Sequence, residues 1–268
     1  MQEMNLRDIQ KVSLDIVKDI HSFCINNNIR YSLAYGSLIG AIRHKGFIPW
    51  DDDMDILMPR PDYERFIKTY ISSDGYMVIP EGDDSMIAMA RVCDMKRTKV
   101  LQHLSPWCTK DVGVWIDVFP LDGAEDDFQL FKRRADEIYN LWEKNLKYRA
   151  SVASFSSSKG IIFNIKLFIK KILWRNYNTS LKHIELLKSI PFGTTAFVTN
   201  LASPCYRTKE YFKIEYFDEY IEVPFEDTTF LAIKEYDKFL TTIYGDYMKL
   251  PPLEVQFSKH SFHKYYWK

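Results

Sequence analysis

The residues of this 268-residue chain with the clearest chemical potential are four aspartates close together, Asp51, Asp52, Asp53 and Asp55. Carboxylates at this density repel one another, so a bound cation is the simplest way to compensate their charge. Hard divalent cations prefer oxygen ligands, and Mg²⁺ keeps coordination positions open for the phosphates of a substrate. The cluster therefore predicts a metal-dependent phosphate site, with Mg²⁺ as the expected ion and Mn²⁺ as the alternative.

The spacing of two of these acids indicates how they are presented. Asp53 and Asp55 are two residues apart, so in a strand that continues through residues 56–58 both side chains project from the same face. Pro59 and Pro61 end this strand. The expected metal ligands are therefore Asp53 and Asp55, with Asp51 as a further ligand or as a group that supports them.

A turn that suits a phosphate precedes the acids. Residues 31–35 predict a short strand, Gly36 a turn, and residues 38–43 the start of a helix. Such a turn presents backbone N–H groups, the Ser37 hydroxyl and a helix dipole to a phosphate. A phosphate cradle followed by a strand with two carboxylates is typical of nucleotidyltransferase-type phosphoryl transfer, in which metal ions clamp the attacking and leaving oxygens.

This arrangement requires a third carboxylate on a neighbouring strand, and Asp117 is the candidate. It interrupts a run of β-branched and aromatic residues at 112–119, where a buried strand rarely carries an acid. We expect Asp117 to complete the metal site and to help deprotonate an acceptor. The structural alternative for Asp117 is a charge paired within the core.

The remaining elements are expected to build a mixed sheet around these residues. Helices are predicted over residues 6–24, from 61, over 128–149 and over 232–244, and further strands over 76–79, 88–94 and 112–119. The expected fold is α+β of α/β type: a nucleotidyltransferase-like mixed β-sheet core with helices packed on it, and a mostly helical middle and C-terminal part. Residues 1–123 would form the catalytic core and residues 124–268 would complete the acceptor side, within one integrated unit.

Several blocks of this sequence resemble the LicD family of bacterial phosphocholine transferases, which is similar to the fukutin-related ribitol-phosphate transferases of animals. The first block, at residues 36–55, reads GSLIGAIRHKGFIPWDDDMD and is long and specific. Residues 91–100 and 115–123 resemble the next two blocks, and residues 263–267 resemble the tail. The middle third of the chain carries almost no signature.

The resemblance implies Mg²⁺-dependent transfer of a phospho-substituent, foremost phosphocholine, from a CDP-linked donor such as CDP-choline to a hydroxyl, with release of CMP. The acceptor would be a cell-surface glycan (lipopolysaccharide, capsule or teichoic acid) or its lipid-linked precursor. Asp53, Asp55 and Asp117 would be catalytic. Phosphoethanolamine, an aminoethylphosphonate and an alditol phosphate could use the same metal site, so the transferred group stays open, as do the acceptor and the oligomeric state.

The substrate-binding residues expected for this activity are Gly36, Ser37, Arg43, Lys45, Trp50, Arg91, Arg97 and His263. The basic side chains would offset phosphate charge, with ordinary surface charge as their alternative role. Trp50, Trp107 or Trp115 could face a quaternary ammonium through cation–π contact, although core packing competes with this role at each position.

Other interpretations of the acidic cluster explain less of the sequence. A calcium loop requires glycine at its sixth position, where this chain has Ile56. A metal-dependent glycosyltransferase using a nucleotide-sugar leaves Gly36, Ser37 and Asp117 unexplained. A non-catalytic scaffold would not need to retain every acid. A nucleotidyltransferase that transfers the nucleotide itself remains open, because its leaving product, pyrophosphate rather than CMP, is not readable from motifs.

Composition limits the broader class. Lysine and arginine balance aspartate and glutamate at 36 each, which argues against a dedicated nucleic-acid binder. No apolar run reaches membrane-spanning length, and the N-terminus does not look like a signal peptide, so we expect a cytoplasmic protein. The cysteines, Cys24, Cys93, Cys108 and Cys205, form no paired motif and are expected to be reduced, with Cys93 buried in a strand.

A basic amphipathic segment at residues 159–175 adds a possible membrane contact. Its apolar stripe comprises Ile161, Ile162, Ile165, Phe168, Ile169, Ile172 and Leu173. Lys166, Lys170, Lys171 and Arg175 lie off this stripe. Such a helix can lie in a membrane interface or pack on the protein core. We favour peripheral attachment to the inner face of the plasma membrane, because the acceptors implied by the resemblance are commonly built there on lipid carriers.

Overall fold

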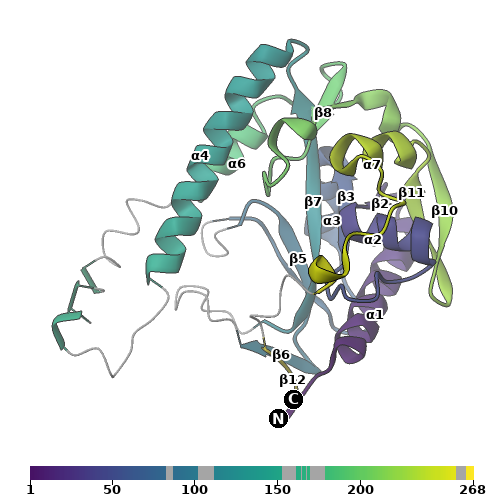
Figure 1. Cartoon of the computed structure of the whole chain (residues 1–268), viewed down its shortest axis with the longest axis vertical. Coiled ribbons are helices and arrows are strands. Elements are labelled where there is room, and N and C mark those ends of the chain that lie inside the picture. Colours follow the sequence, from purple (N-terminus) through teal and green to yellow (C-terminus); the bar gives the residue numbers. More distant parts are fainter. Residues whose placement is uncertain are drawn as a thin grey trace.

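A mixed β-sheet forms the centre of the molecule (Figure 1). The computed structural model describes all residues except 83–86, 102–111, 153–160, 164, 167, 170–178 and 258–263, and only the backbone of 147–152. Within this described part the main sheet has the strand order β2-β3-β7-β5-β4. These strands are β2 (Ser32–Leu33), β3 (Asp55–Pro59), β4 (Met77–Ile79), β5 (Ala90–Asp94) and β7 (Val114–Ala124). Only β3 and β7 run parallel, and the other pairs of this path are antiparallel.

The two parallel strands lie at the centre because their sequences are apolar enough to be covered on both faces. Ile56 and Met58 of β3 and Ile116 and Val118 of β7 have no exposed surface. Buried parallel strands of this kind read as nearly continuous hydrophobic runs. Burying the charge of an acid inside such a run costs free energy. Asp55 is the first residue of β3, and Asp117 interrupts the apolar run of β7.

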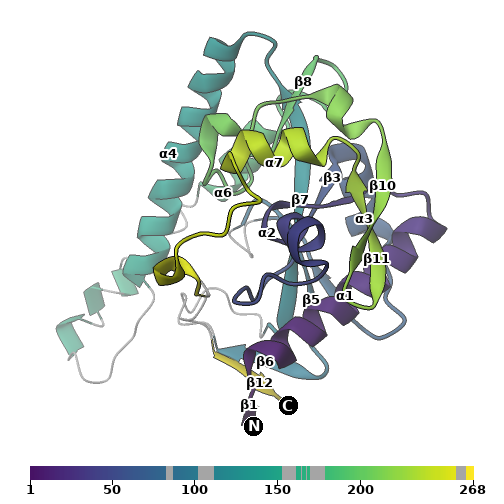
Figure 2. The same ribbon diagram turned by 45° about the vertical axis from the view of Figure 1, so that its right-hand side comes forward.

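The helices cover the sheet and close its ends. α1 (Leu6–Asn26) and α3 (Arg60–Thr69) pack on β7, and α1 begins with a capping box between Asn5 and Asp8. α2 (Tyr35–Ile39) continues into a π-helical turn at Gly40–His44 and contacts α7 (Tyr236–Tyr244). α4 (Phe128–Val152) and α6 (Ser180–Leu187) pack against each other. Figure 2 shows α2 and α7 on the same side of the sheet.

The C-terminal part returns to the sheet at several points. β8 (Phe197–Thr199) pairs with β7 and with β9 (Phe212–Lys213), and β10 (Tyr220–Phe225) forms a hairpin with β11 (Thr228–Ile233). This hairpin is fixed to β2, because the Ile233 N–H donates to the Ser32 hydroxyl at 3.0 Å. Short 3₁₀ turns lie at Arg207–Lys209, Ile214–Phe217 and Leu253–Val255. Residues of the two predicted regions therefore share hydrogen bonds.

The C-terminal tail packs back on the protein. β12 (Lys264–Trp267) pairs with β6 (Thr98–Leu101) and with β1 (Gln2–Glu3), which brings the two chain ends together in Figure 1. Lys264–Trp267 is therefore held against both β6 and the N-terminal strand. β6 itself was not predicted, because its four residues are too few for a period-two pattern.

The expected fold class is confirmed, with corrections at the level of single elements. The closing helix was predicted to start at Ala232, but Ala232 and Ile233 end β11 and the helix starts at Tyr236. α2 begins at Tyr35, before the predicted Leu38, and β7 extends five residues beyond Phe119. Cys93 is fully buried, as expected for its strand.

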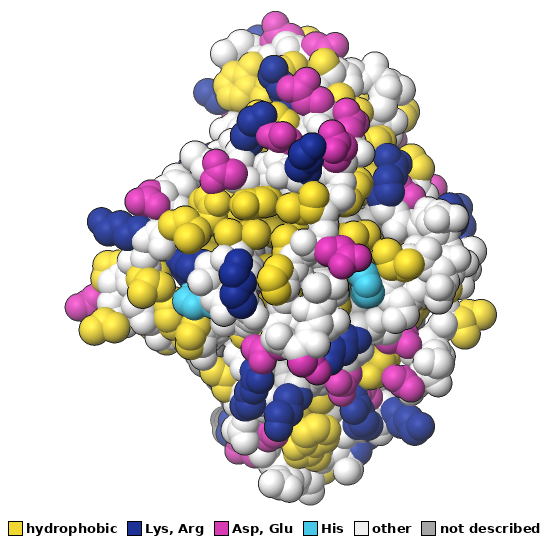
Figure 3. All heavy atoms as spheres, turned by 90° about the vertical axis from the view of Figure 1, so that its right-hand side faces the viewer, with side chains coloured by type: hydrophobic (Ala, Val, Ile, Leu, Met, Phe, Trp, Pro, Cys, Tyr) yellow, Lys and Arg dark blue, Asp and Glu magenta, His cyan; other side chains and the backbone are white. Residues whose placement is uncertain are grey.

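On the face that Figure 3 shows, acidic and basic side chains are interspersed around a band of hydrophobic side chains. Neither charge sign dominates this face. This fits the equal numbers of acidic and basic residues in the sequence. None of the helices in the described part of the chain combines the length and apolar character needed to cross a bilayer.

Candidate active site

Three charged residues form a row across adjacent strands of the sheet. Asp55 of β3 lies opposite Asp117 of β7, and Asp117 lies opposite Arg91 of β5. Residues paired in this way project from the same face of a sheet. The Arg91 Nε donates to Oδ1 of Asp117 at 2.8 Å, and both side chains are largely buried. The structure thus brings the predicted third carboxylate directly beside the predicted metal strand.

The turn before the acids is tied to the same strand. The Ala34 N–H donates to the Asp55 carbonyl at 3.0 Å, and the Asp55 N–H donates to the Ser37 hydroxyl oxygen at 2.8 Å. Gly36 lies against Asp51, since a Cβ at position 36 would come within 2.8 Å of the Asp51 Oδ2. A side chain at position 36 would therefore displace the Asp51 carboxylate from its place against the turn.

The acids form one electrostatic cluster. Burial raises the pKa of Asp55 well above its usual range, and the carboxylates of Asp53, Asp117 and Asp51 raise it further. Asp52 is also buried, with 6% of its surface exposed. The Gln10 side chain of α1 donates to the Asp51 carbonyl at 2.9 Å and so helps hold the loop in place. The carboxylates around Asp55 disfavour its ionisation, and a bound cation would stabilise such a site.

The donor set suits a hard cation, because every candidate ligand is a carboxylate oxygen. However, among the described residues no three or more histidine, cysteine or acidic side chains converge closely enough to hold a metal ion. Binding would therefore require rotation of these carboxylates.

Two of the predicted basic residues lie near the site but contact the protein itself. Arg91 is engaged by Asp117, as described above. Arg43 follows the turn and donates to the carbonyl oxygens of Tyr247 at 2.6 Å and Lys249 at 3.3 Å, which joins the π-helical turn to the segment after α7.

The other two predicted basic residues differ in exposure and contacts. The Arg97 guanidinium pairs with Asp94 and Asp15 and donates to the Tyr76 hydroxyl at 3.2 Å, so it stabilises the turn between β5 and β6. Lys45 is exposed and has a left-handed backbone (φ 59°) at the end of the π-helical turn.

The tryptophans considered for a quaternary ammonium are placed differently from one another. The face of Trp115 is occupied by Arg91, whose guanidinium carbon lies 4.5 Å from the ring centroid. Trp50 is half-buried and meets His44 edge-on, with ring centroids 6.4 Å apart. Trp107 and His263 lie outside the described residues.

The tail contributes an aromatic side chain to the edge of the site. Tyr265 of β12 packs against Trp115 with ring centroids 6.1 Å apart. Burial raises the pKa of the Tyr265 hydroxyl, and Asp52 and Asp53 raise it further, so this residue lies near the acidic loop.

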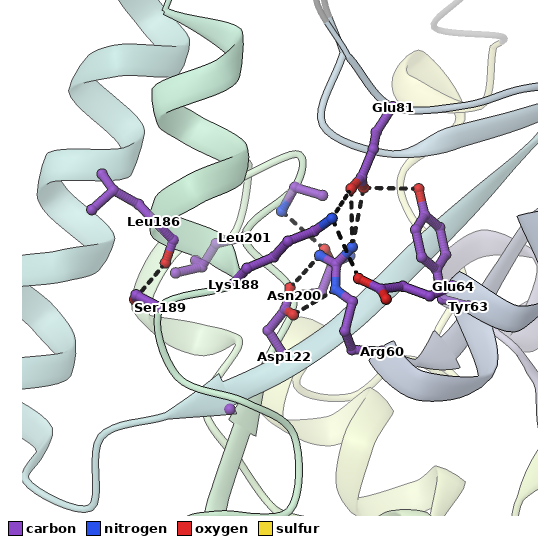
Figure 4. Close-up of polar contacts among 12 residues, drawn as sticks. Arg60, Tyr63, Glu64, Glu81, Asp122, Leu186, Lys188, Ser189, Asn200 and Leu201 are labelled. Atoms are coloured by element: carbon purple, nitrogen blue, oxygen red, sulfur yellow. Dashed lines mark hydrogen bonds and ion pairs between the residues drawn. The ribbon is translucent and has the colours of Figure 1, made fainter.

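Asp122, the other acid of β7, has a structural role. Figure 4 shows it in a buried network with Arg60, which donates to both Asp122 carboxylate oxygens at 2.7 Å. Arg60 also forms an ion pair with Glu81 at 3.1 Å, and the Lys188 ammonium forms a second ion pair with Glu81 at 2.7 Å. The network joins α3, β7 and the segment after α6.

A second group of aromatic residues near Asp55 was missed by the sequence analysis. Tyr206 and Tyr244 are half-buried, and the Tyr206 hydroxyl donates to that of Tyr244 at 2.9 Å. Burial raises the pKa of both hydroxyls, and the carboxylates of Asp55 and Glu210 raise both further. These tyrosines come from a part of the chain without recognisable motifs, so no local pattern identifies them.

Comparison with known proteins agrees with this geometry. The family model described as the LicD/FKTN/FKRP nucleotidyltransferase domain matches residues 28–145, which include the turn, the acidic cluster and Asp117. The chain is 32% identical over 97% of both sequences to the lipopolysaccharide cholinephosphotransferase LicD of Haemophilus influenzae. Two uncharacterised proteins, from Rickettsia typhi and Rickettsia prowazekii, are 45% and 51% identical over 19% and 15% of this chain and 16% and 15% of their own lengths. The chain therefore belongs to the LicD family of phosphotransferases.

Proposed function

We propose that this enzyme transfers phosphocholine from CDP-choline to a glycan hydroxyl and releases CMP, with Mg²⁺ held by the acidic cluster. The observation that carries the proposal is the placement of Asp55 and Asp117 side by side on parallel strands. The turn at Gly36 and Ser37 lies beside this pair, because Ser37 accepts the Asp55 N–H and Gly36 lies against Asp51. Similarity to a lipopolysaccharide cholinephosphotransferase over nearly the whole chain supports phosphocholine as the transferred group and lipopolysaccharide as the acceptor class.

In the proposed reaction the acceptor oxygen attacks the choline-bearing phosphorus, and the bond from that phosphorus to the CMP oxygen breaks. Asp53 and Asp55, with Asp51 beside them, would hold the metal ion. When bound, Mg²⁺ would neutralise charge on the transferred phosphate and on the departing CMP.

Asp117 would take the proton that the acceptor hydroxyl loses. Its ion pair with Arg91 engages Oδ1 and fixes the orientation of the carboxylate. The pairing with β3 places Asp117 next to Asp55, so the base and the metal-binding side chains share one face. A base held by its neighbours in this way is positioned before the substrate arrives.

The backbone at the start of α2 would receive a donor phosphate. The Ser37 hydroxyl oxygen already accepts the Asp55 N–H, so its own hydrogen is the part that can be donated to a phosphate. Gly36 leaves room for Asp51 at this point. The turn therefore links phosphate binding to the position of the acidic strand.

A lipid-linked acceptor at the inner face of the plasma membrane is the further part of the proposal. Five side chains of the predicted apolar stripe lie in the described residues, and all are exposed: Ile161, Ile162, Ile165, Phe168 and Ile169, at 51–78% of their surface. Their exposure argues against the alternative in which this stripe packs on the core. Lys166 lies among them, and three further basic residues follow in the sequence.

The test is incubation of the purified protein with CDP-choline, CDP-ethanolamine or CDP-ribitol, with Mg²⁺ and a lipopolysaccharide acceptor. We expect CMP release and acceptor labelling with CDP-choline, and neither after chelation of the metal. The Asp55→Asn variant serves as the inactive control. Release of pyrophosphate from CTP in place of CMP release would identify a nucleotidyltransferase, and turnover of CDP-ribitol alone would reassign the transferred group.

A further inference from the structure

An aromatic wall extends from the acidic row along the same face of the sheet. Phe119 lies two residues after Asp117 in β7, so its side chain projects from the same face about 6.6 Å further along the strand. The Tyr35 ring packs edge-on against Phe119, with centroids 5.5 Å apart, and stacks on Tyr206 at 5.9 Å. Tyr206 in turn meets Tyr244 edge-on at 5.3 Å.

The backbone is strained where it presents these rings. Tyr35 has a left-handed conformation (φ 48°), as does Arg207 (φ 50°), the residue directly after Tyr206. Non-glycine residues keep this conformation only where the surrounding contacts over-determine it, and such strain gathers at functional sites. Left-handed backbone thus occurs at Tyr35 and directly after Tyr206, the two residues whose rings stack.

A buried acid behind the rings lacks a full set of partners. Glu210 is 1% exposed; its Oε2 accepts the Tyr35 hydroxyl at 2.6 Å, but its Oε1 has no hydrogen-bond partner in the described structure. Asn200 donates to the same Tyr35 hydroxyl at 2.6 Å and fixes its direction. Among the described residues an ionised Glu210 has no cation partner and a protonated Oε1 has no acceptor, so the acid is uncompensated in either state.

The nearby basic side chains are directed elsewhere. The guanidinium of Arg207 lies over the ring of Tyr139, with its central carbon 3.4 Å from the ring centroid. The Lys209 ammonium donates to the Ile243 carbonyl at 3.1 Å. Within the described part of the chain, no protein cation lies over the rings of Tyr206 or Tyr244.

We propose that Tyr206 and Tyr244, backed by Tyr35 and Glu210, form the subsite for the quaternary ammonium of the donor. A trimethylammonium group donates no strong hydrogen bonds, so it is best held by aromatic faces and diffuse negative charge. The half-buried Tyr206 and Tyr244 supply the faces. Burial raises the pKa of Glu210, and a cation bound in front of it would favour its ionised form, which has an unsatisfied oxygen. This inference rests on the proposed function, because it assigns the choline end of the same donor.

The position of the subsite also fits the reaction. Tyr206 stacks on Tyr35, and Tyr35 packs on Phe119, two residues after Asp117 in β7, so the rings lie close to where the transferred phosphorus would be held. Tyr244 is the last residue of α7, which contacts α2, and α2 begins at Tyr35. The same packed elements would therefore hold the phosphate and the ammonium of one phosphocholine group.

The test measures binding rather than turnover. Titration calorimetry would compare CDP-choline with CDP-neohexanol, a neutral isostere in which carbon replaces the quaternary nitrogen, and with CMP. We expect the wild type to bind CDP-choline about tenfold more tightly than the isostere, as a desolvated cation–π contact predicts. Tyr206→Leu should bring this ratio to about one and leave CMP affinity unchanged, whereas Tyr206→Phe, which keeps the ring, should retain most of it.

The controls separate this subsite from fold and from catalysis. Tyr216→Leu removes a partly exposed tyrosine that faces Lys238 instead, and it should not change the ratio. Glu210→Gln, almost the same shape, should lower the ratio and gives a second test should Tyr206→Leu not fold.

Equal affinity of the wild type for the two CDP compounds, with CMP still released from CDP-choline, would overturn the subsite and leave the transfer intact. An unchanged ratio in a folded Tyr206→Leu variant would also overturn it, whereas a normal ratio without turnover would refute the transfer alone.

Discussion

The hydroxyl oxygen of Ser37 accepts a hydrogen bond from the backbone N–H of Asp55 at 2.8 Å. Asp55 is the first residue of β3, and β2 pairs only with the two residues that follow it. Ser37 therefore supplies the hydrogen-bond partner that the short neighbouring strand does not reach. The contact joins the turn proposed to bind phosphate and the strand proposed to bind the metal into one unit.

Replacement of Ser37 by alanine should therefore reduce both stability and activity. The Asp55 N–H would lose its partner, and an unsatisfied buried donor costs about 1–3 kcal/mol. Urea unfolding followed by circular dichroism would measure this change, and CMP release would fall because Asp55 is no longer held. Ser189→Ala, at an exposed serine that donates to the Leu186 carbonyl, is the matched control and should leave both quantities nearly unchanged.

The acidic strands of the site could be predicted because their signals are local. Asp55 starts one apolar run and Asp117 interrupts another. An acid next to or within an apolar strand pattern is conspicuous, so both candidates can be found from the sequence around them. The glycine turn is likewise a local signal, and the structure places the Asp51 carboxylate directly against Gly36. Period-two and period-3.6 patterns carry this information within a few residues.

The partners of these acids could not be predicted, because they depend on which distant segments meet. Nothing in the sequence around Arg91 distinguishes pairing with Asp117 from contact with a phosphate. Glu210 and Tyr35 are 175 positions apart and touch only in the folded chain. The closing helix was misplaced because Ala232 and Ile233 fit a helical pattern as well as a strand, and pairing with β10 decides between them.

Asp53→Asn and Asp55→Asn should each abolish turnover while leaving the fold intact. Both substitutions remove a carboxylate that a metal ion would need, so we expect CMP release to fall on the order of a hundredfold or more. Both also remove repulsion from a cluster whose members raise the pKa of Asp55, so the thermal unfolding midpoint should stay equal or rise. Near wild-type CMP release by either variant would refute the metal assignment.

Asp117→Asn should affect catalysis more than donor binding. Asparagine keeps an oxygen for the Arg91 hydrogen bond, but it cannot accept the proton of the acceptor hydroxyl. Loss of a general base lowers kcat by about 10²–10⁴-fold, and we expect the KM for the donor to change far less. Steady-state kinetics with varied CDP-choline would separate the two parameters. A variant that simply unfolds would instead support a structural role for Asp117.

Asp122→Ala should unfold more easily without any direct effect on the chemistry. It would leave the buried guanidinium of Arg60 without its bidentate partner, and breaking a buried pair in this way costs about 3–5 kcal/mol. Chemical denaturation would measure the loss, and kcat of the folded fraction should be close to wild type. Asp227→Ala breaks the ion pair of an exposed acid with Lys18 and should show no measurable loss. Equal stability of the two variants would contradict the importance of the network.

The exposed stripe at residues 161–169 predicts salt-sensitive binding to anionic membranes. Its five described apolar side chains can enter the interface, and each basic residue near an anionic surface adds roughly 1 kcal/mol. The protein should therefore sediment with anionic vesicles at low salt and be released at high salt. Replacement of Lys166, Lys170 and Lys171 by glutamate should weaken binding by roughly 3 kcal/mol or more, which exceeds a hundredfold.

A matched variant separates this effect from a change in net charge. Lys11, Lys213 and Lys249 are exposed at other places on the molecule, and their replacement by glutamate changes the net charge by the same amount. We expect this control to keep most of the vesicle binding, and both triple variants to release CMP normally with a soluble acceptor analogue. Since the two variants differ only in where the charge is reversed, equal loss of binding would show a non-specific electrostatic effect. Absence of binding by the wild type at low salt would remove the membrane from the proposed function and leave the soluble reaction standing.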